Sequence, residues 1–182
     1  MSVYVHLATG FEELEALSPV DVLRRGGVDV KTVSVTGEKT VVGSHGIPVT
    51  ADLLFSEADY EDCEMIVLPG GLGGVASARA SSAALDALRY GWDHDKYVAA
   101  ICAGPTVLAD LGITDGKNAT CYPSCTGQMG NAALAENAAV VRDGRLITGT
   151  SAGCAIPFAL ALIAALKGTP AADAVAAQIV IR

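Results

Sequence analysis

The stretch Ala99-Ala100-Ile101-Cys102-Ala103-Gly104-Pro105 decides the fold predicted for this chain. Residues 97–101 form an apolar run with the character of a buried strand, and this run leads directly into Cys102. Small residues follow, and Pro105 suits the first turn of a helix. A strand, a tight turn and a helix in this order form a nucleophile elbow, in which one side chain projects from the carboxyl edge of a sheet.

The Cys102 thiol has two interpretations at this point. Above a helix N-terminus, the helix dipole and the free backbone N–H groups favour the thiolate and lower the pKa of the thiol. A small cysteine buried in the core would show the same local sequence. Both interpretations stay open on these residues alone.

Short β-branched runs alternate with helical patterns on either side of this stretch, which indicates an α/β fold with a mostly parallel sheet and helices on both faces. Strands are expected over residues 3–8, 28–35, 65–68 and 97–101, helices over residues 11–25, 83–92, 105–111 and 155–167, and hairpins over residues 38–52 and 140–147. Pro19 is expected to kink or interrupt the first helix. Because no repeat or linker breaks the pattern, residues 1–182 are expected to form a single domain.

Composition excludes several classes of function. The formal net charge is −8, from 20 acidic and 12 basic residues, which argues against a general nucleic-acid binder. No apolar run approaches the roughly 20 residues of a membrane-spanning helix. The N-terminus lacks the basic region and the cleavage site of a secretory signal, so a cytoplasmic location is expected. The five cysteines are then expected to be free thiols.

Two further loops could contribute to a site. Pro69-Gly70-Gly71-Leu72-Gly73-Gly74 follows a buried strand, and its glycines would let backbone N–H groups approach a ligand or an oxyanion. It matches neither a phosphate loop nor a dinucleotide fingerprint, and alone it is an ordinary turn. In Glu12-Glu13-Leu14-Glu15, the first two acids are interpreted as solvated partners of a helix dipole. Periodicity does not decide whether Glu15 is buried.

Taken together, these three loops resemble the ThiJ/PfpI superfamily, the family of the parkinsonism-associated protein deglycase, over nearly the whole chain. The matching motifs are Glu12-Glu13-Leu14-Glu15 with residues 19–27, Leu68-Pro69-Gly70-Gly71, and the stretch around Cys102. The resemblance implies a flavodoxin-like three-layer sandwich and a homodimer. It implies Cys102 as the nucleophile and Glu15 as a buried, protonated carboxyl that hydrogen-bonds the thiolate. The backbone N–H groups of Gly71 and Ala103 match the family's oxyanion site, with Gly70 beside them.

The chain departs from the family pattern in several places. Thr120-Cys121-Tyr122-Pro123 puts Tyr122 where the deglycase branch often has a histidine. Tyr122 is therefore expected to line the site as a hydrogen-bond donor, because a phenol is a poor base at neutral pH. Cys121 and Cys154 are also expected near Cys102, where either could form a redox disulfide with it.

Other readings of the site are disfavoured. Ala103 stands where protease-like members have histidine, which argues against a peptidase. No histidine follows Cys102, which excludes a glutamine amidotransferase. Cys121 and Cys125 lack accompanying histidines or a second cysteine pair, so neither a metal nor a cofactor is expected. His6 is expected to be a packed core residue. His45 and Arg25 are interpreted as solvated surface residues, with a dimer interface as the alternative.

The leading hypothesis is a cysteine-dependent enzyme that acts on small reactive carbonyls. Cys102 would attack a 2-oxoaldehyde or its adduct, and Glu15 would shuttle a proton between carbons, giving a 2-hydroxy acid in glyoxalase-type or deglycase-type chemistry. The alternative is a redox-sensing or chaperone-like oxidative-stress protein in which Cys102 is oxidised to a sulfinate without turnover.

We predict that Cys102 is the most reactive of the five thiols, because the elbow exposes it above a helix N-terminus. Alkylation with limiting reagent at mildly acidic pH, read by peptide mass spectrometry, should label Cys102 first. Initial labelling of Cys63 or Cys125 would show that the site is assigned to the wrong cysteine.

Overall fold

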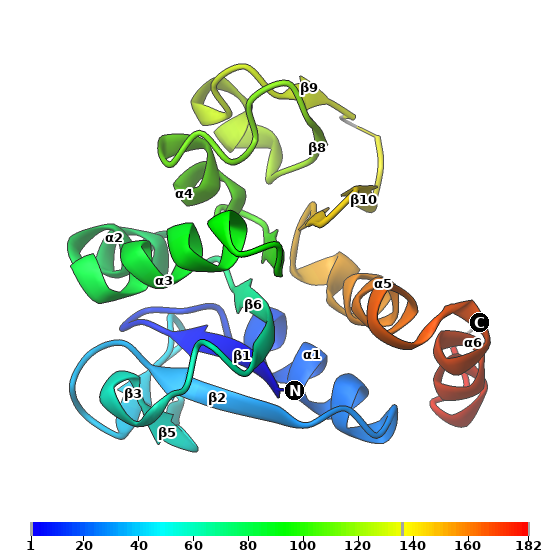
Figure 1. Ribbon diagram of the computed structural model, residues 1–182, viewed down its shortest axis with the longest axis horizontal. Helices are drawn as coiled ribbons and strands as arrows, with labels where there is room; N and C mark the ends of the chain where they lie inside the picture. Colours follow the sequence, from blue (N-terminus) through cyan, green and yellow to red (C-terminus); the bar gives the residue numbers. More distant parts are fainter. Residues whose placement is uncertain (1, 136, 182) are drawn as a thin grey trace.

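A seven-stranded sheet forms the centre of the computed structural model, which describes residues 2–135 and 137–181 (Figure 1). From one edge to the other, its strands are β5 (Leu53–Leu54), β2 (Val30–Ser34), β1 (Ser2–Leu7), β6 (Cys63–Leu68), β7 (Tyr97–Ile101), β11 (Leu146–Gly149) and β10 (Val140–Asp143). Neighbouring strands are parallel except β10 and β11, which form an antiparallel hairpin. The order β2-β1-β6-β7-β11 is the 2-1-3-4-5 order of flavodoxin-like folds, so the predicted fold class is confirmed.

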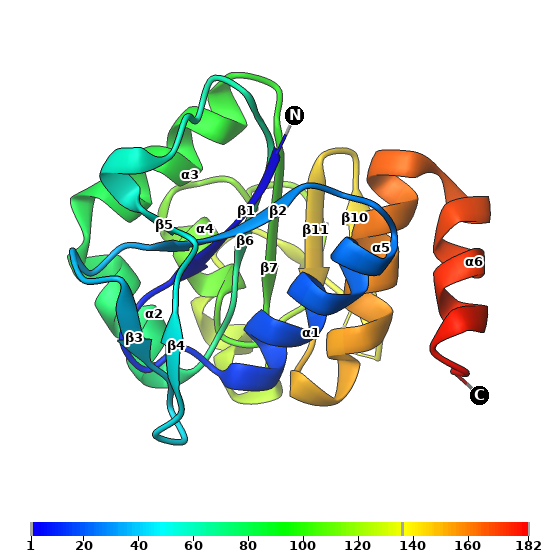
Figure 2. The ribbon, with the colours of Figure 1, turned by 90° about the horizontal axis from the view of Figure 1, so that it is seen from below.

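Helices cover both faces of this sheet (Figures 1 and 2). One face carries α1 (Glu13–Arg25) and α5 (Ala155–Lys167), with α6 (Thr169–Gln178) packed on α5. The other face carries α2 (Leu72–Ala80), α3 (Ser82–Asp93) and α4 (Pro105–Asp110). The smaller elements are the β3–β4 hairpin (Thr40–Val42 and Pro48–Thr50), the parallel pair β8 and β9 (Asn118–Ala119 and Ala133–Leu134), and short 3₁₀ turns at Phe55–Glu57, Pro123–Gln128 and Ala152–Cys154. Within the described ranges, the helices are all too short or too polar to span a bilayer.

Alternation along the central strands produces two separate apolar cores. In β1, Val3 and Val5 point toward the α1 and α5 side, whereas Tyr4 points toward the α2 and α3 side. In β7, Ala99 and Ile101 face the first side and Val98 faces the second. Because both faces are covered, every residue of β1 is buried, and the strand reads as a nearly continuous apolar run.

The predicted strands, hairpins and helices are all present, with their ends shifted by at most a few residues. Pro19 was expected to kink or interrupt this helix, and the interruption does not occur, because α1 continues through Pro19 to Arg25. Pro19 has no N–H to donate to the carbonyl of Glu15. Its side chain is buried, and packing of α1 on the sheet and on α5 offsets the missing hydrogen bond. Helices α2 and α6 were not predicted, since Gly73 and Gly74 in α2 hide its helical pattern.

Backbone contact between two loops fixes the carboxyl edge of the sheet. The N–H of Gly74 donates to the carbonyl of Gly10 at 2.8 Å, and the N–H of Glu12 donates to the carbonyl of Gly70 at 3.0 Å. Gly71, with φ of +85°, is so close that a Cβ would lie 2.6 Å from the oxygen of Gly10. Only glycine allows this approach, which brings the start of α1 against the end of β6.

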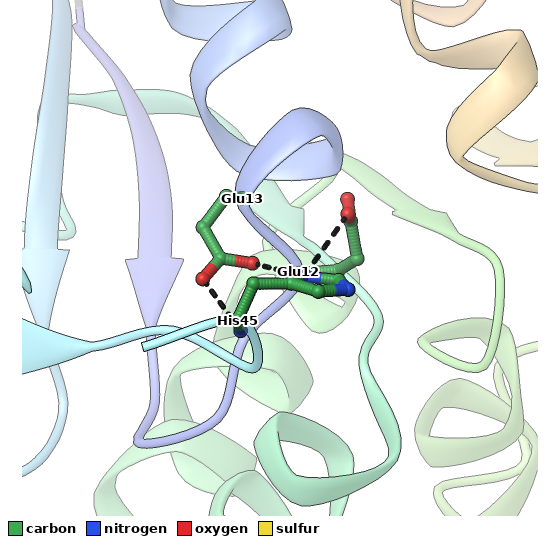
Figure 3. Close-up of side chains that lie close together, drawn as sticks. All are labelled: Glu12, Glu13 and His45. Atoms are coloured by element: carbon green, nitrogen blue, oxygen red, sulfur yellow. Dashed lines mark hydrogen bonds and ion pairs between the residues drawn. The ribbon is translucent and has the colours of Figure 1, made fainter. Parts of the chain in front are cut away.

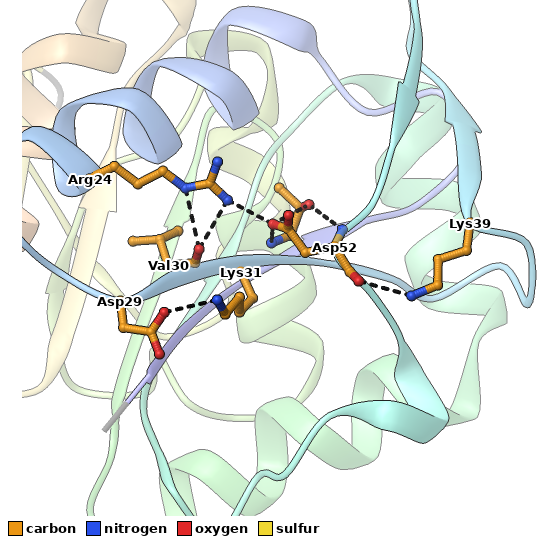
Figure 4. A network of polar contacts seen from close by, with 7 residues as sticks. Arg24, Asp29, Val30, Lys31, Lys39 and Asp52 are labelled. Carbon is orange, nitrogen blue, oxygen red and sulfur yellow. Dashed lines mark hydrogen bonds and ion pairs between the residues drawn. The ribbon is translucent and has the colours of Figure 1, made fainter.

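A polar network anchors the β3–β4 hairpin to the edge of the sheet (Figure 4). Asp52 Oδ2 accepts hydrogen bonds from Arg24 at 2.7 Å and from the backbone N–H of Thr32 at 2.8 Å. Arg24 also donates to the carbonyl of Val30 at 3.1 Å, and Lys39 donates to the carbonyl of Asp52 at 2.8 Å. These bonds join α1, β2 and the hairpin, and so position the hairpin tip.

His6 is a buried core residue, as the sequence predicts. Its Nε2 lies 2.7 Å from the hydroxyl of Tyr60, and its Nδ1 has no hydrogen-bond partner among the described residues. Burial lowers the pKa of His6 to about 4, because the charged imidazolium would lose its hydration.

The buried His6 predicts a stability that depends on pH. The unfolded chain binds a proton at about pH 6.5 and the folded chain only at about pH 4, so stability is lost as pH falls between these values, by up to about 3 kcal/mol. Urea unfolding should show this loss as a pH-dependent difference in stability between the wild type and His6→Gln, because the other titrating groups contribute equally to both proteins. His94→Gln, at an exposed position, serves as the control. Equal pH slopes for the wild type and His6→Gln would refute the assignment.

Candidate active site

Cys102 occupies a strained position at the end of β7. Its φ is +62°, a region that residues other than glycine adopt at a cost of roughly 1–3 kcal/mol. Two hydrogen bonds hold it there: its N–H donates to the carbonyl of Gly149 at 2.9 Å, and its carbonyl accepts from the N–H of Tyr122 at 2.8 Å. Gly104 completes the turn, because a Cβ there would lie 2.8 Å from the carbonyl oxygen of Leu68. The elbow predicted from sequence is thus present as backbone geometry.

Glu15, whose burial periodicity left open, is buried in the first turn of α1 with only 1% exposure. Its Oε2 accepts a hydrogen bond from the N–H of Gly70 at 2.9 Å, while Oε1 has no hydrogen-bond partner among the described residues. A Cβ at Gly70 would lie 2.6 Å from Oε2 of Glu15 and 2.8 Å from Cβ of Cys102. The carboxyl group and the cysteine therefore meet in one space that exists because residue 70 has no side chain.

Burial raises the pKa of both groups, and the charge of Glu15 adds to the rise at Cys102, whereas the hydrogen bond with Cys102 lowers the pKa of Glu15. Burial raises the pKa of Glu15 to about 7, and the negative charge of Glu12 adds to this effect. Burial, followed by the charge of Glu15, raises the pKa of Cys102 to about 12, against the lowering effect of the Ala103 and Gly71 N–H groups. Because two adjacent negative charges are unfavourable away from water, the pair retains one proton near neutral pH.

This result corrects the sequence-based expectation of a lowered pKa at Cys102. The expected backbone donors are present, but burial and the neighbouring Glu15 outweigh them. Helix α4 spans only Pro105–Asp110, so its dipole is also small. The reactivity of Cys102 therefore depends on where the shared proton lies.

Cys102 opens into a cleft of about 500 Å³ at the carboxyl edge of the sheet. The cleft lies beside the carboxyl ends of β1 and β6, where strand order reverses and ligands of this fold class bind. Its walls include Glu12, His45, Gly71, Leu72, Ala103 and Tyr122. The large side chains of Leu72 and Tyr122 are exposed at its rim.

The structure brings together some of the sequence-predicted site residues and separates others. Gly70, Gly71, Ala103 and Tyr122 lie around Cys102 and Glu15. Cys121 instead lines a neighbouring hollow of about 320 Å³, and its thiol donates to the carbonyl of Tyr122 at 3.4 Å.

The cysteines other than Cys102 lie outside the cleft wall. The Sγ atom of Cys154 lies 3.9 Å from the hydroxyl of Ser151, and Cys154 is not among the residues that line the cleft. Cys63 and Cys125 are buried, and all five cysteines are free thiols. The structure therefore brings neither Cys121 nor Cys154 into the cleft beside Cys102.

A second acid–base cluster, which the sequence analysis missed, lies at the rim of the same cleft (Figure 3). Glu13 is 5% exposed, so its interpretation as a solvated acid is wrong. Its Oε1 accepts from the backbone N–H of His45 at 2.7 Å, and its Oε2 lies 2.8 Å from Nδ1 of His45 and 3.1 Å from the hydroxyl of Ser44. Although burial opposes ionisation, these hydrogen bonds lower the pKa of Glu13 to about 2.

His45 is exposed, as the sequence suggests, but it is also ion-paired. Hydrogen bonding to Glu13 and the charge of that carboxylate raise the pKa of His45. Donor atoms of Glu12, Glu13 and His45 lie within 4.8 Å of one another, a spacing that could hold a metal ion. However, Nδ1 of His45 and Oε2 of Glu13 are already hydrogen-bonded to each other, and Oε1 of Glu13 already accepts a hydrogen bond from the backbone N–H of His45 in the hairpin. No local sequence pattern indicates this cluster, because the hairpin and α1 come into contact only in the folded chain.

Known proteins match this chain over most of its length. The DJ-1/PfpI family profile matches residues 1–165. Protein dj-1beta of Drosophila melanogaster is 39% identical over 168 residues, covering 92% of this chain and 90% of the relative. The protein named deglycase PH1704, of Pyrococcus horikoshii, is 33% identical over 149 residues, covering 81% of this chain and 89% of the relative.

The fold agrees with these sequence matches. The crystal structure of Drosophila melanogaster DJ-1beta superposes with a TM-score of 0.94 at 37% identity, and covers 100% of this chain and 98% of that chain. The family match spans the strands, loops and helices that build the Cys102 cleft. The resemblance inferred from the three loops is thereby confirmed, and the chain belongs to the DJ-1/PfpI family.

Proposed function

We propose that this protein is a cysteine-dependent enzyme that converts 2-oxoaldehydes, or their adducts, to 2-hydroxy acids without a cofactor. The observation that carries the proposal is the unpartnered Oε1 of Glu15, a buried carboxyl oxygen beside the Cys102 thiol. A buried polar atom without a partner is unfavourable unless a reacting group satisfies it. A family member named deglycase PH1704 supports chemistry on carbonyl adducts.

The reaction follows from the positions of these groups. The sulfur of Cys102 adds to the aldehyde carbon, and the thiol proton ends on the former carbonyl oxygen, giving a hemithioacetal. Glu15 then removes the hydrogen from that carbon as a proton and returns it to the adjacent ketone carbon, while the hydroxyl proton of the hemithioacetal passes to the ketone oxygen, which leaves a thioester bearing a 2-hydroxyl group. Water hydrolyses the thioester, so the net change is addition of one water to the 2-oxoaldehyde. The N–H groups of Gly71 and Ala103 would stabilise the oxygen charge.

The acidity of Glu15 suits this role. A proton shuttle works best when its pKa lies near the working pH, because both protonation states are then populated. Burial raises the pKa of Glu15 to about 7, which meets this condition.

A redox role is the second candidate, and the exposure of Cys102 favours it. Cys102 is partly exposed, whereas Cys63, Cys121 and Cys125 are buried, so an oxidant in solution reaches Cys102 more readily than these three. The N–H groups of Gly71 and Ala103 would hold a sulfinate without turnover. Conversion of methylglyoxal to lactate by the wild type, and its absence in Cys102→Ser, separates the enzyme from the sensor.

We also propose that the protein is a cytoplasmic homodimer of single ThiJ/PfpI-type domains. The support for a dimer is an exposed stripe along α1, where Leu14, Ser18, Asp21 and Arg25 share one helix face. Ile156 of α5 borders the hollow that Ser18, Asp21 and Arg25 line, and Leu14 is 59% exposed. Leu14 and Ile156 are exposed apolar side chains beside the polar residues of this stripe, and an exposed apolar patch rimmed by polar residues is typical of a protein interface.

Replacing Glu15 tests the proton shuttle. Glu15→Gln keeps a hydrogen-bond donor near the sulfur, whereas Glu15→Leu removes it, so Glu15→Leu should show the higher Cys102 pKa by ultraviolet thiolate absorbance. Both variants should lose dicarbonyl turnover by at least about 10²-fold, since neither can carry the proton. Turnover at the wild-type rate in both variants would reduce Glu15 to a structural acid.

Replacing Tyr122 tests whether its phenol is an essential acid or base. Tyr122 is 44% exposed at the rim of the cleft, and its backbone N–H, not its side chain, bonds Cys102. Tyr122→Phe should therefore retain most activity, with a loss well below the roughly 10²–10⁴-fold expected for a missing acid–base group. A loss as severe as that of Cys102→Ser, measured as kcat/KM, would contradict this expectation.

A further inference from the structure

The last step of the proposed reaction, hydrolysis of the thioester, needs a base that neither Glu15 nor Tyr122 supplies. Hydrolysis of the Cys102 thioester requires a group that takes a proton from water. Glu15 is buried behind Gly70, and it shares its proton with Cys102 on the inner side of the site. Tyr122 is a phenol and a poor base near neutral pH. The following inference rests on the proposed function, and it concerns the solvent side of the same cleft.

His45 lies on that side, and buried Glu13 orients its ring (Figure 3). Ionised Glu13 can only accept hydrogen bonds, so the 2.8 Å contact from Nδ1 requires that Nδ1 carries a proton. In the neutral imidazole, the lone pair is then on Nε2, which has no hydrogen-bond partner among the described residues. A carboxylate that fixes the tautomer in this way prepares a histidine to act as a base through its other nitrogen.

The hydrogen-bonded pair of Glu13 and His45, called the dyad below, lies at the same cleft as the nucleophile Cys102. His45 and Cys102 both line it, as do Gly71 and Glu12, and Glu12 Oε1 lies 3.9 Å from Nδ1 of His45. Gly71 and Glu12 are in close contact, since a Cβ on Gly71 would lie 2.8 Å from the nitrogen of Glu12. An acyl group on Cys102 would therefore occupy a cleft that His45 also lines, with the buried Glu15 close to the sulfur.

We propose that His45, oriented by Glu13, is the general base that activates water for hydrolysis of the Cys102 thioester. Nε2 takes a proton from water, and the oxygen of that water forms a bond to the thioester carbonyl carbon. The tetrahedral intermediate expels the sulfur of Cys102 as the C–S bond breaks, and the acid product leaves. The imidazolium then releases its proton to solvent, and the expelled Cys102 thiolate with Glu15 takes one proton up from solvent, which restores the starting state. Water is the only co-reactant, and no oxidant or reductant is needed.

Local charges favour this role. The charged groups that face His45, among the described residues, are Glu13 and Glu12 at the start of α1, and Glu12 Oε1 lies 3.9 Å from Nδ1. Ser44 of the hairpin adds a hydroxyl 3.1 Å from Nδ1. The side chain of Glu13 is 7% exposed and that of His45 is 70% exposed, so the carboxylate is shielded while Nε2 can meet water. An imidazolium that forms during proton transfer is stabilised by this carboxylate.

A purely structural role for the dyad predicts different behaviour. The same hydrogen bonds attach the hairpin to α1, so if they were only structural, their loss would lower the stability of the fold. It would not give the deacylation step its pH dependence, nor would imidazole in solution replace it. Deacylation must therefore be measured separately from acylation.

The experiment uses p-nitrophenyl acetate, an activated ester that acylates a reactive thiol whether or not the protein converts dicarbonyls. The wild type should release a burst of p-nitrophenolate as Cys102 is acylated, followed by a slower steady rate set by deacylation. That steady rate should rise with pH through the pKa of His45. Cys102→Ser should lose the burst.

In His45→Gln, the burst should remain, while the steady rate should fall by about 10²-fold. The acetylated chain should then accumulate and be visible by intact mass, and imidazole in solution should restore the steady rate. Glu13→Gln removes the charge that raises the pKa of His45, so its rise in rate should move to lower pH. His94→Gln is the matched control, because His94 is an exposed histidine at the end of α3, outside the cleft.

Three results would overturn the inference: no burst in the wild type, equal steady rates in the wild type and His45→Gln at every pH, or a pH profile that Glu13→Gln leaves unchanged. If His45→Gln loses both its burst and its melting transition, this variant is unfolded, and the shift of the pH profile in Glu13→Gln then decides whether His45 is the base. Deacylation that needs His45, without conversion of methylglyoxal, would refute the proposed function but uphold the role of His45. Methylglyoxal conversion by the wild type, together with unchanged deacylation in His45→Gln, would uphold the proposed function but refute the role of His45.

Discussion

A buried carboxyl group and a thiol share one space around Gly70, and the rest of the site depends on this arrangement. A side chain at residue 70 would collide with both Glu15 and Cys102. The space exists because three chain segments converge at the carboxyl edge of the sheet: the first turn of α1, the end of β6 and the elbow after β7. The positive φ of Cys102 is maintained by hydrogen bonds to Gly149 and Tyr122, which belong to separate parts of the chain. Strain of this kind persists only when the surroundings hold it.

The two acidic residues in the first turn of α1 are both buried, yet their pKa values are shifted in opposite directions. Glu13 and Glu15 are both nearly inaccessible, yet the pKa of Glu13 is lowered to about 2 and that of Glu15 is raised to about 7. The difference lies in the balance of effects, because hydrogen bonds from the hairpin outweigh burial at Glu13, whereas burial outweighs the hydrogen bonds at Glu15. One carboxyl is therefore suited to remain charged and the other to exchange a proton. Side chains two residues apart on a helix point in different directions, which separates their environments.

Much of this molecule could be predicted from sequence, and the reasons are local. Alternation of apolar strands and helices required a covered parallel sheet, and the small residues after Ile101 required a tight elbow. The family resemblance rests on three loops, each of which is a short continuous segment of the chain. The exceptions have physical causes as well. Pro19 was expected to kink or interrupt α1, but tertiary packing compensates for one lost hydrogen bond. Helix α2 was missed because its glycines serve close backbone contact with Gly10.

The sequence by itself determined the fold class, the elbow at Cys102 and the presence of acidic residues at the start of α1, because each depends on neighbouring residues. The family resemblance implied that Glu15 faces Cys102, but only the tertiary structure decided that Glu13 is buried against the hairpin. It also decided the direction of the pKa shift at Cys102, which burial and Glu15 raise although the elbow alone suggests a lower value. It placed His45 in the same cleft as Cys102, although 56 residues separate them in the chain. Burial and charge pairing arise between distant segments, so they are properties of the folded chain and not of any stretch within it.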